Sequence, residues 1–213
     1  MMIGGRHLGA AADPPVSVHL AIDDRPELTF DVAPGFFLRF HTLPAGALSG
    51  TGRFARLTVA ATAPHGAPAP RLALEQFNLQ NPEIVQLGFD QGWQEPEYNP
   101  STGRSWRWMS ERATLALHSG GRDVLLRIEG ESPLRYFGRG STLSITVAGE
   151  PVAQLRPTSD FVGEVAIPAA LLARGDGKVT LEADQMFRPG DREGSLDVRH
   201  LALRLYSVTA RPR

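Results

Sequence analysis

The sequence of 213 residues contains no cysteine, which excludes disulfide bonds and thiolate chemistry. It also has no apolar run near the length of about 18 residues that a membrane-spanning helix needs. No apolar stretch follows Arg6 and His7, so we expect neither a signal peptide nor a membrane span in this soluble chain. Its 22 basic and 23 acidic residues give a net charge of −1, which offers no electrostatic basis for binding nucleic acid.

Motifs for enzyme chemistry are absent as well. The sequence has no Gly-x-Ser-x-Gly elbow, no phosphate-binding glycine loop before a helix and no dinucleotide fingerprint. Its six histidines are too scattered to indicate a zinc site. Helical signals are limited to two single turns, at 43–48 and 167–172. We therefore expect no enzyme, no catalytic residues and no cofactor.

Glycine, proline and short alternating runs are what the sequence has in abundance. Its 22 glycines and 17 prolines separate short segments in which apolar and polar residues alternate. This pattern is typical of half-buried antiparallel strands and predicts an all-β fold. The clearest runs cover 16–22, 36–40, 55–61, 71–79, 113–117, 124–128, 142–148, 161–167, 178–183 and 198–208.

An internal repeat organises these segments. Ile3-Gly4-Gly5 resembles Ile128-Glu129-Gly130, and later matches follow at a nearly constant separation. These matches are Val18, Leu20 and Ile22 with Leu143, Ile145 and Val147; Phe36 with Phe161; Leu43-Pro44 with Ile167-Pro168; 57–59 with 179–181; and 72–74 and Phe77 with 201–203 and Tyr206. The repeat predicts two tandem jelly-roll-like antiparallel β-sandwiches, at 1–82 and 83–213.

The two copies are unequal. The second contains an additional segment, 88–127, that has no counterpart in the first. We therefore expect the first sandwich to lack its N-terminal strands and to expose strand edges. It would then belong to a longer protein, or it would be completed by a strand from another chain, including self-association with a second copy.

All three tryptophans lie within one segment of the second copy, 93–108. Aromatic rings beside carboxylates and guanidinium groups are typical of sugar-binding surfaces, because the rings stack on apolar sugar faces and the polar groups bond hydroxyls. The candidate ligand-binding residues are Trp93, Glu95, Glu97, Tyr98, Trp106 and Arg107. In the alternative interpretation Trp106 and Trp108 pack in the sandwich core, and we favour this structural role for Trp108.

Charged residues near the end of the sequence suggest structural bracing. Asp197 and Arg199 share the parity of one strand, and a bidentate bridge reaching Glu95 or Glu97 would brace the last strand. A third hypothesis treats Glu95 and Glu97 as a glycoside hydrolase pair, although one loop does not specify the carboxylate separation which that reaction needs.

Calcium is the one metal with candidate ligands. Asp184, Asp191 and Glu193 cluster before Asp197, and calcium takes carboxylate and carbonyl oxygens. The cluster lacks a regular loop pattern such as that of the EF-hand. A solvated acidic loop is therefore the alternative to a structural Ca²⁺ site.

Several segments resemble the C-terminal soluble region of bacterial integral-membrane glycosyltransferases. They are 88–97 (GFDQGWQEPE), 104–110 (RSWRWMS), 131–137 (ESPLRYF) and 197–204 (DVRHLALR), while 4–9 (GGRHLG) and 32–39 (VAPGFFLR) look like the companion domain. The resemblance implies galactose-binding-like, carbohydrate-binding-module-type jelly rolls outside the cytoplasm, in the periplasm or at the cell surface. It implies that catalysis belongs to a membrane portion, and it carries over no ligand-contacting residue.

These features together predict a non-catalytic module that binds carbohydrate or positions a glycan-processing membrane protein. The alternative is a structural or assembly domain that is completed by a strand from outside the first sandwich. Both hypotheses rest on the repeat and on the missing catalytic motifs, and they differ in whether the aromatic segment carries the function.

Overall fold

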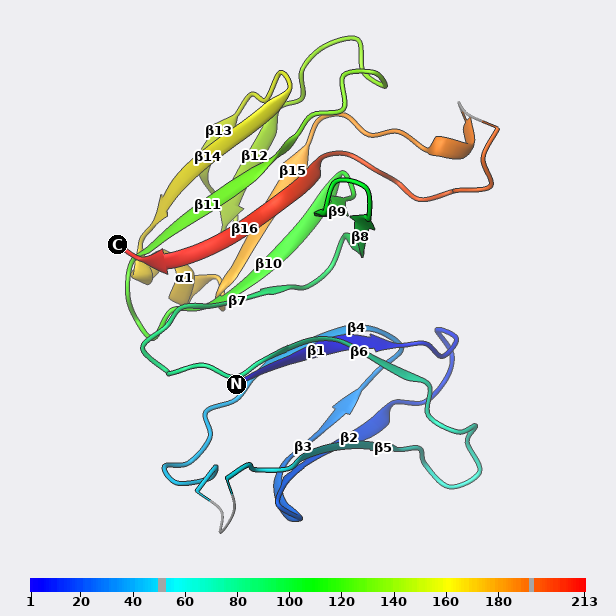
Figure 1. Cartoon of the computed structure of the whole chain (residues 1–213), viewed down its shortest axis with the longest axis vertical. Helices are drawn as coiled ribbons and strands as arrows, with labels where there is room; N and C mark the ends of the chain where they lie inside the picture. Colours follow the sequence, from blue (N-terminus) through cyan, green and yellow to red (C-terminus); the bar gives the residue numbers. More distant parts are fainter. Residues whose placement is uncertain (50–52, 192–193) are drawn as a thin grey trace. The chain divides into compact units, whose positions relative to one another are not determined.

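The computed structural model describes residues 1–49, 53–191 and 194–213 (Figure 1). The chain divides into two compact units, Met1–Gln80 and Asn81–Arg213. Strands dominate both units, so the predicted all-β fold is confirmed. The helical elements in the described ranges are α1 (Ala169–Arg174) and η1 (Pro189–Asp191). No helix in these ranges is long and apolar enough to cross a membrane.

The strands follow one another without long helical connections. Those of the first unit are β1 (Met2–His7), β2 (Val16–Ile22), β3 (Arg25–Val32), β4 (Gly35–Phe40), β5 (Leu57–Thr62) and β6 (Leu72–Asn78). Those of the second unit are β7 (Gln86–Phe89), β8 (Trp93–Asn99), β9 (Arg104–Met109), β10 (Arg112–His118), β11 (Val124–Glu131), β12 (Leu143–Val147), β13 (Glu150–Leu155), β14 (Asp160–Ile167), β15 (Lys178–Ala183) and β16 (Arg204–Pro212).

The first unit is a small sandwich of two three-stranded antiparallel sheets, with strand orders β4-β1-β6 and β3-β2-β5. Alternation along β2 buries Val18, Leu20 and Ile22 and leaves the residues between them half-exposed. Ile3 and Phe37 of the other sheet pack with them in the core. The period-two pattern therefore sets which face of each sheet turns inward.

The second unit is a larger sandwich of two five-stranded antiparallel sheets. Their strand orders are β13-β12-β15-β10-β7 and β14-β11-β16-β9-β8. Both sheets contribute fully buried side chains to one core, among them Leu115, Leu126, Ile145 and Leu181. The core therefore lies between two complete sheet faces.

The two units repeat one arrangement of six strands. The sheet orders β4-β1-β6 and β3-β2-β5 recur as β14-β11-β16 and β13-β12-β15. A register shift follows Gly4 in β1, and another follows Glu129 at the same place in β11. A second pair of shifts follows Leu20 in β2 and Ile145 in β12. The repeat therefore extends to the irregularities of the sheets.

Strand pairing corrects three of the sequence matches. Phe77 pairs with Ile3 as Val208 pairs with Ile128, so Phe77 corresponds to Val208 and not to Tyr206. Gly130 pairs with Phe161, and its counterpart Gly5 pairs with Phe37, so Phe37 rather than Phe36 corresponds to Phe161. The same glycines face Leu205 and Leu74 on their other side, so segment 72–74 corresponds to 203–205 and not to 201–203. Sequence similarity alone does not detect such slips, because short apolar runs match in more than one register.

Four strands distinguish the second unit from the first. β10 and β7 extend one sheet beyond β15, and β9 and β8 extend the other beyond β16 (Figure 1). In the first unit the corresponding strands, β5 and β6, are the last of their sheets in the part of the chain that the structure describes.

Candidate functional site

The aromatic segment forms the hairpin of β8 and β9, at the edge of a five-stranded sheet. Met109 is fully buried in the main core, so Arg107 shares its inner face and Trp106 and Trp108 lie on the outer face. The hairpin therefore divides its aromatic and charged residues between the two faces of the sheet.

Trp93 was expected on a ligand-binding surface, and this prediction is wrong. Its side chain is 2% exposed and belongs to the main core. The indole Nε1 donates a 2.8 Å hydrogen bond to the carbonyl of Thr114, and the ring meets Phe89 edge-on. The cause is a register shift between Trp93 and Pro96, which turns Trp93 inward although Glu97 faces outward.

Trp106 is half-buried on the outer face and is held by a carboxylate. It stands opposite Glu97 across the hairpin, and its Nε1 donates a 2.9 Å hydrogen bond to a Glu97 carboxylate oxygen. The guanidinium of Arg204 lies over the ring, 5.1 Å from the Trp106 centroid. Trp106 is thus an aromatic residue fixed among charged groups, as the sequence hypothesis requires of a sugar-binding surface.

Tyr206 and Glu131 continue this surface across the sheet. Arg204 and Tyr206 both bond the Glu131 carboxylate, and the Arg104 guanidinium lies 4.4 Å from the Tyr206 ring centroid. We call Glu97, Arg104, Trp106, Glu131, Arg204 and Tyr206 the outer-face cluster. It spans β8, β9, β16 and β11, whose side-by-side order brings distant sequence segments together.

The charges of the outer-face cluster are set by mutual hydrogen bonds. Burial alone would raise the pKa of Glu131, but hydrogen bonds from Tyr206 and Arg204 outweigh burial and hold this pKa below its usual value. Burial and the hydrogen bond to Glu131 raise the pKa of Tyr206 to about 12. At neutral pH the cluster therefore presents a carboxylate, a guanidinium and a neutral phenol.

The predicted ion pair between Asp197 and Arg199 is present, although both residues precede β16 and do not lie on the last strand. Arg199 donates Nε at 3.0 Å and Nη2 at 2.7 Å to the Asp197 carboxylate, and its Nη1 donates a 2.9 Å hydrogen bond to Glu97. The guanidinium thus ties the segment before β16 to β8. Hydrogen bonds from Arg199 are the main reason that the pKa of Asp197 lies below its usual value.

Trp108 has a structural role, but not in the main core. It is buried in a smaller apolar cluster on the outer side of the sheet, with Tyr136, Phe187 and Leu201. Phe187 stacks on Tyr136 at 3.8 Å and meets Trp108 edge-on. This cluster packs the loops that contain Tyr136 and Phe187 over one end of the sheet, and Trp106 lies at its margin.

The remaining ligand candidates lie apart from the outer-face cluster. Tyr98 pairs with Ser105, so it points to the opposite face of the hairpin, where it is 61% exposed. Arg107 also faces inward, with its guanidinium 4.7 Å from the Phe89 ring centroid. Glu95 is exposed beside the bulge. The structure therefore joins Glu97 and Trp106 and separates them from Tyr98 and Arg107.

The calcium candidates do not form one site among the residues described. Asp184 accepts hydrogen bonds from Arg139 and from the backbone N–H of Thr142, and Asp191 lies 3.9 Å from Arg188. Among the described residues, no three His, Asp or Glu side chains lie together where they could hold a metal ion. Glu193 lies outside the described residues.

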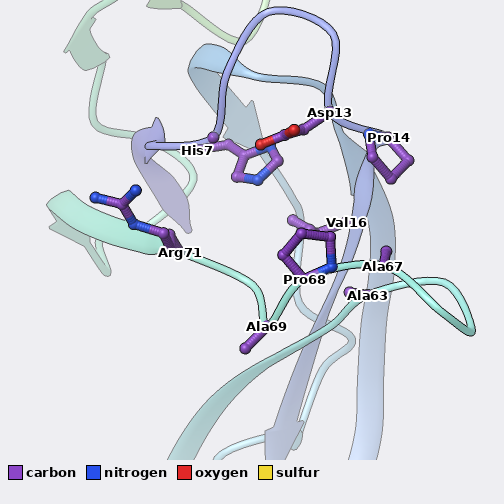
Figure 2. Close-up of a pocket in the computed structure, with 10 residues that line it drawn as sticks. His7, Asp13, Pro14, Val16, Ala63, Ala67, Pro68, Ala69 and Arg71 are labelled. Atoms are coloured by element: carbon purple, nitrogen blue, oxygen red, sulfur yellow. The ribbon is translucent and has the colours of Figure 1, made fainter.

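A small cavity in the first unit is lined by His7, Asp13 and Arg71 (Figure 2). His7 is 5% exposed, and its Nδ1 has no partner among the described residues. The cavity volume of about 30 Å³ is that of one water molecule, which could bond this nitrogen. The cavity is too small for a sugar.

Sequence reasoning missed Arg104, Glu131, Arg204 and Tyr206. Arg204 and Tyr206 alternate with Leu205 in β16, and strand alternation would have placed them on the face opposite this buried leucine. Their proximity to Trp106 was not detectable, because it depends on β16 lying beside β9. No family model matches this chain, and no curated protein matches it either.

Proposed function

We propose that the second unit, Asn81–Arg213, is a non-catalytic carbohydrate-binding module, and that its ligand lies on the outer-face cluster. One observation carries the proposal: Trp106 is half-buried and surrounded by hydrogen-bonding groups of three neighbouring strands. An aromatic face with carboxylate, guanidinium and phenol groups beside it matches the alternating apolar and hydroxyl character of a sugar ring.

The arrangement supports binding better than hydrolysis. Glu97 accepts hydrogen bonds from Trp106 and Arg199, so its carboxylate is used to hold the hairpin. A glycosidase needs one carboxylic acid that is protonated near neutral pH, usually through a raised pKa. The pKa of Glu131, the other carboxylate of the cluster, is lowered instead. We therefore assign no catalytic residue.

The cellular context in the proposal comes from the sequence resemblance described above. That resemblance implies a module outside the cytoplasm that is an accessory to a bacterial glycan-processing membrane protein. The balanced charge of −1 fits a neutral or weakly charged saccharide better than a polyanion. No particular sugar is assigned.

Titration against a panel of neutral oligosaccharides, with a glycan array for breadth, tests this proposal. Trp106→Ala should weaken binding about tenfold or more, because a stacked aromatic contact contributes about 1–2 kcal/mol. Tyr98→Ala is the matched control, since Tyr98 belongs to the same hairpin and faces the other way. Fluorescence of Trp93 and Trp108 verifies the fold of both variants.

Two outcomes would overturn the proposal. Either the wild-type chain binds no saccharide of the panel, or Trp106→Ala binds normally. If Tyr98→Ala alone loses binding, the ligand occupies the opposite face of the hairpin and the outer-face cluster is not the site.

A further inference from the structure

The first unit has two sheet edges whose counterparts in the second unit are covered. β15 is paired by β10 and β16 by β9, whereas β5 and β6 pair on one side only within residues 1–49, 53–191 and 194–213. An unpaired strand edge presents a row of backbone donors and acceptors that another strand can bond. The internal repeat thus shows what kind of element fits these edges.

Apolar side chains along these edges are exposed where their counterparts are buried. Leu74 of β6 is 46% exposed, whereas Leu205, which faces the equivalent glycine, is 2% exposed. Leu57 of β5 is half-buried, whereas its counterpart Val179 is fully buried. The second unit covers these positions with β9 and β10, so the same apolar surface lacks its cover in the first unit.

A cavity lies at the open side of the first sandwich. Its volume is about 470 Å³, and its lining includes Ile22, Leu57, Phe77 and Leu79. Phe77 and Leu79 are 48% and 44% exposed. Ile22 corresponds to Val147 and Leu57 to Val179, two residues of the second core that share that core with Leu115 and Leu117 of β10. The cavity therefore has the position that inward-facing side chains of an added strand would fill.

We propose that the first unit binds an extended polypeptide segment from a different protein, which pairs antiparallel with β5 and inserts alternate apolar side chains into this cavity. The inference does not depend on the proposed carbohydrate site, because it concerns the other unit. Strand addition of this kind obtains affinity from backbone hydrogen bonds and specificity from alternate side chains.

The repeat also predicts the register of the bound strand. In the second unit Leu115 pairs with Val179 and Thr114 with Thr180. The first-unit counterparts of Val179 and Thr180 are Leu57 and Thr58. An apolar residue of the partner should therefore stand opposite Leu57, and its preceding residue should stand opposite the exposed Thr58.

A second copy of this chain fits the cavity less well than a separate segment. The apolar side chains of its own β5, Leu57 and Val59, already pack against its own core. Pairing through two β5 edges would add backbone hydrogen bonds, but it would bring no free side chains to fill the volume. The partner is therefore an extended segment with apolar residues at alternate positions, as in β10.

Disulfide trapping tests the proposal, because the chain contains no cysteine. The probe is a synthetic peptide of residues 111–119 with Thr114→Cys, whose thiol is activated as a mixed disulfide with thionitrobenzoate. The protein is the full chain with Thr58→Cys, and attack by its thiol releases the thionitrobenzoate as the new disulfide forms. The full chain with Thr29→Cys is the matched control, since Thr29 is an exposed threonine at the opposite edge of the same sheet. Its strand, β3, corresponds to β13, which is also an edge.

We expect Thr58→Cys to capture the peptide about tenfold faster than Thr29→Cys, because pairing raises the local concentration of the thiol. A peptide with Leu115→Asp and Leu117→Asp should lose this advantage. Hydrogen exchange on the wild-type chain gives a second measurement that needs no variant. The unmodified peptide should slow exchange in 57–62 more than in 25–32.

Any of four results would overturn the proposal. One is that Thr58→Cys and Thr29→Cys capture the peptide at equal rates. Another is that Thr58→Cys captures the aspartate peptide as fast as the parent peptide. The third is a covalent Thr58→Cys dimer that forms without peptide and prevents its capture, since a second copy would then be the occupant. Absence of peptide protection in 57–62 of the wild-type chain would count against it in the same way.

Discussion

The two units are built on the same six strands, and the comparison shows what four further strands add. Ile3 and Ile128 occupy equivalent places in β1 and β11, and both are fully buried. Toward the edges the units diverge, because Leu74 is exposed where Leu205 is buried. The six shared strands therefore suffice for a small core. In the second unit, β7–β10 extend both sheets and cover the side of the core that is exposed in the first.

The comparison also explains why the candidate carbohydrate surface occurs once. A bulge at Gly5 leaves Glu75 beside Arg6, and the equivalent bulge at Gly130 leaves Tyr206 beside Glu131. Both units thus hold a polar pair at the same point of the sheet. Only the second has a neighbouring β9 that brings Trp106 to it, within the described residues.

The largest expected effect comes from the glycines at these bulges. A Cβ on Gly5 would lie 1.9 Å from the carbonyl oxygen of Ala73, and one on Gly130 would lie 2.6 Å from that of Arg204. Since backbone cannot move away cheaply, Gly5→Ala should destabilise the first unit by about 4 kcal/mol or more and Gly130→Ala should cost the second unit somewhat less.

Hydrogen exchange of 2–7 and 124–131 measures this effect in each unit separately. Gly138→Ala is the control, because a Cβ there meets nothing within 4 Å. Normal protection of the first unit in Gly5→Ala would show that the bulge is not needed for its pairing.

The equivalent isoleucines should show how much closure contributes to core stability. We expect Ile128→Ala to cost about 4 kcal/mol and Ile3→Ala about 2 kcal/mol, because a cavity in the closed core relaxes less than one beside an open edge. Urea unfolding measures the first through tryptophan fluorescence, since all three tryptophans lie in the second unit. Hydrogen exchange measures the loss of stability in Ile3→Ala. Equal losses of stability in the two variants would contradict the idea that closure of the core matters.

A smaller expected effect is that the free energy of unfolding of the second unit falls at acid pH through Asp197. Hydrogen bonds from Arg199 lower the pKa of Asp197. A depressed carboxyl pKa stabilises the fold above the ordinary aspartate value of about 4, and this contribution is lost as pH falls through the lowered pKa. Arg199→Gln should therefore reduce stability at pH 7 by about 1 kcal/mol, since both side chains are partly solvated.

Urea unfolding at pH 7 and at pH 3, followed by tryptophan fluorescence, measures this difference. The difference in free energy of unfolding between wild type and Arg199→Gln should be smaller at pH 3 than at pH 7. Arg188→Gln serves as the control, since Arg188 lies 3.9 Å from its partner Asp191 and makes only a loose ion pair. If this free-energy difference is the same at both pH values, the Arg199 bridge does not act through the charge of Asp197.

Much of the fold could be predicted from the sequence because burial on one face of a strand leaves a period-two pattern. Residues 16–22 are an example, since every predicted inward position in β2 is buried. The sequence also predicted a bridge from Arg199 to Glu95 or Glu97, and the structure shows that Glu97 is the partner.

The sequence by itself determined the all-β class, the repeat and the composition of the aromatic segment. Tertiary structure decided which of those aromatic residues face outward, because a single bulge at Trp93–Pro96 reverses the face of every residue on one side of it. It also decided that Arg204 and Tyr206 lie near Trp106, and that among the residues described β5 and β6 each pair on one side only. Alternation is local and can be read along the chain, whereas register and strand order depend on contacts between distant segments.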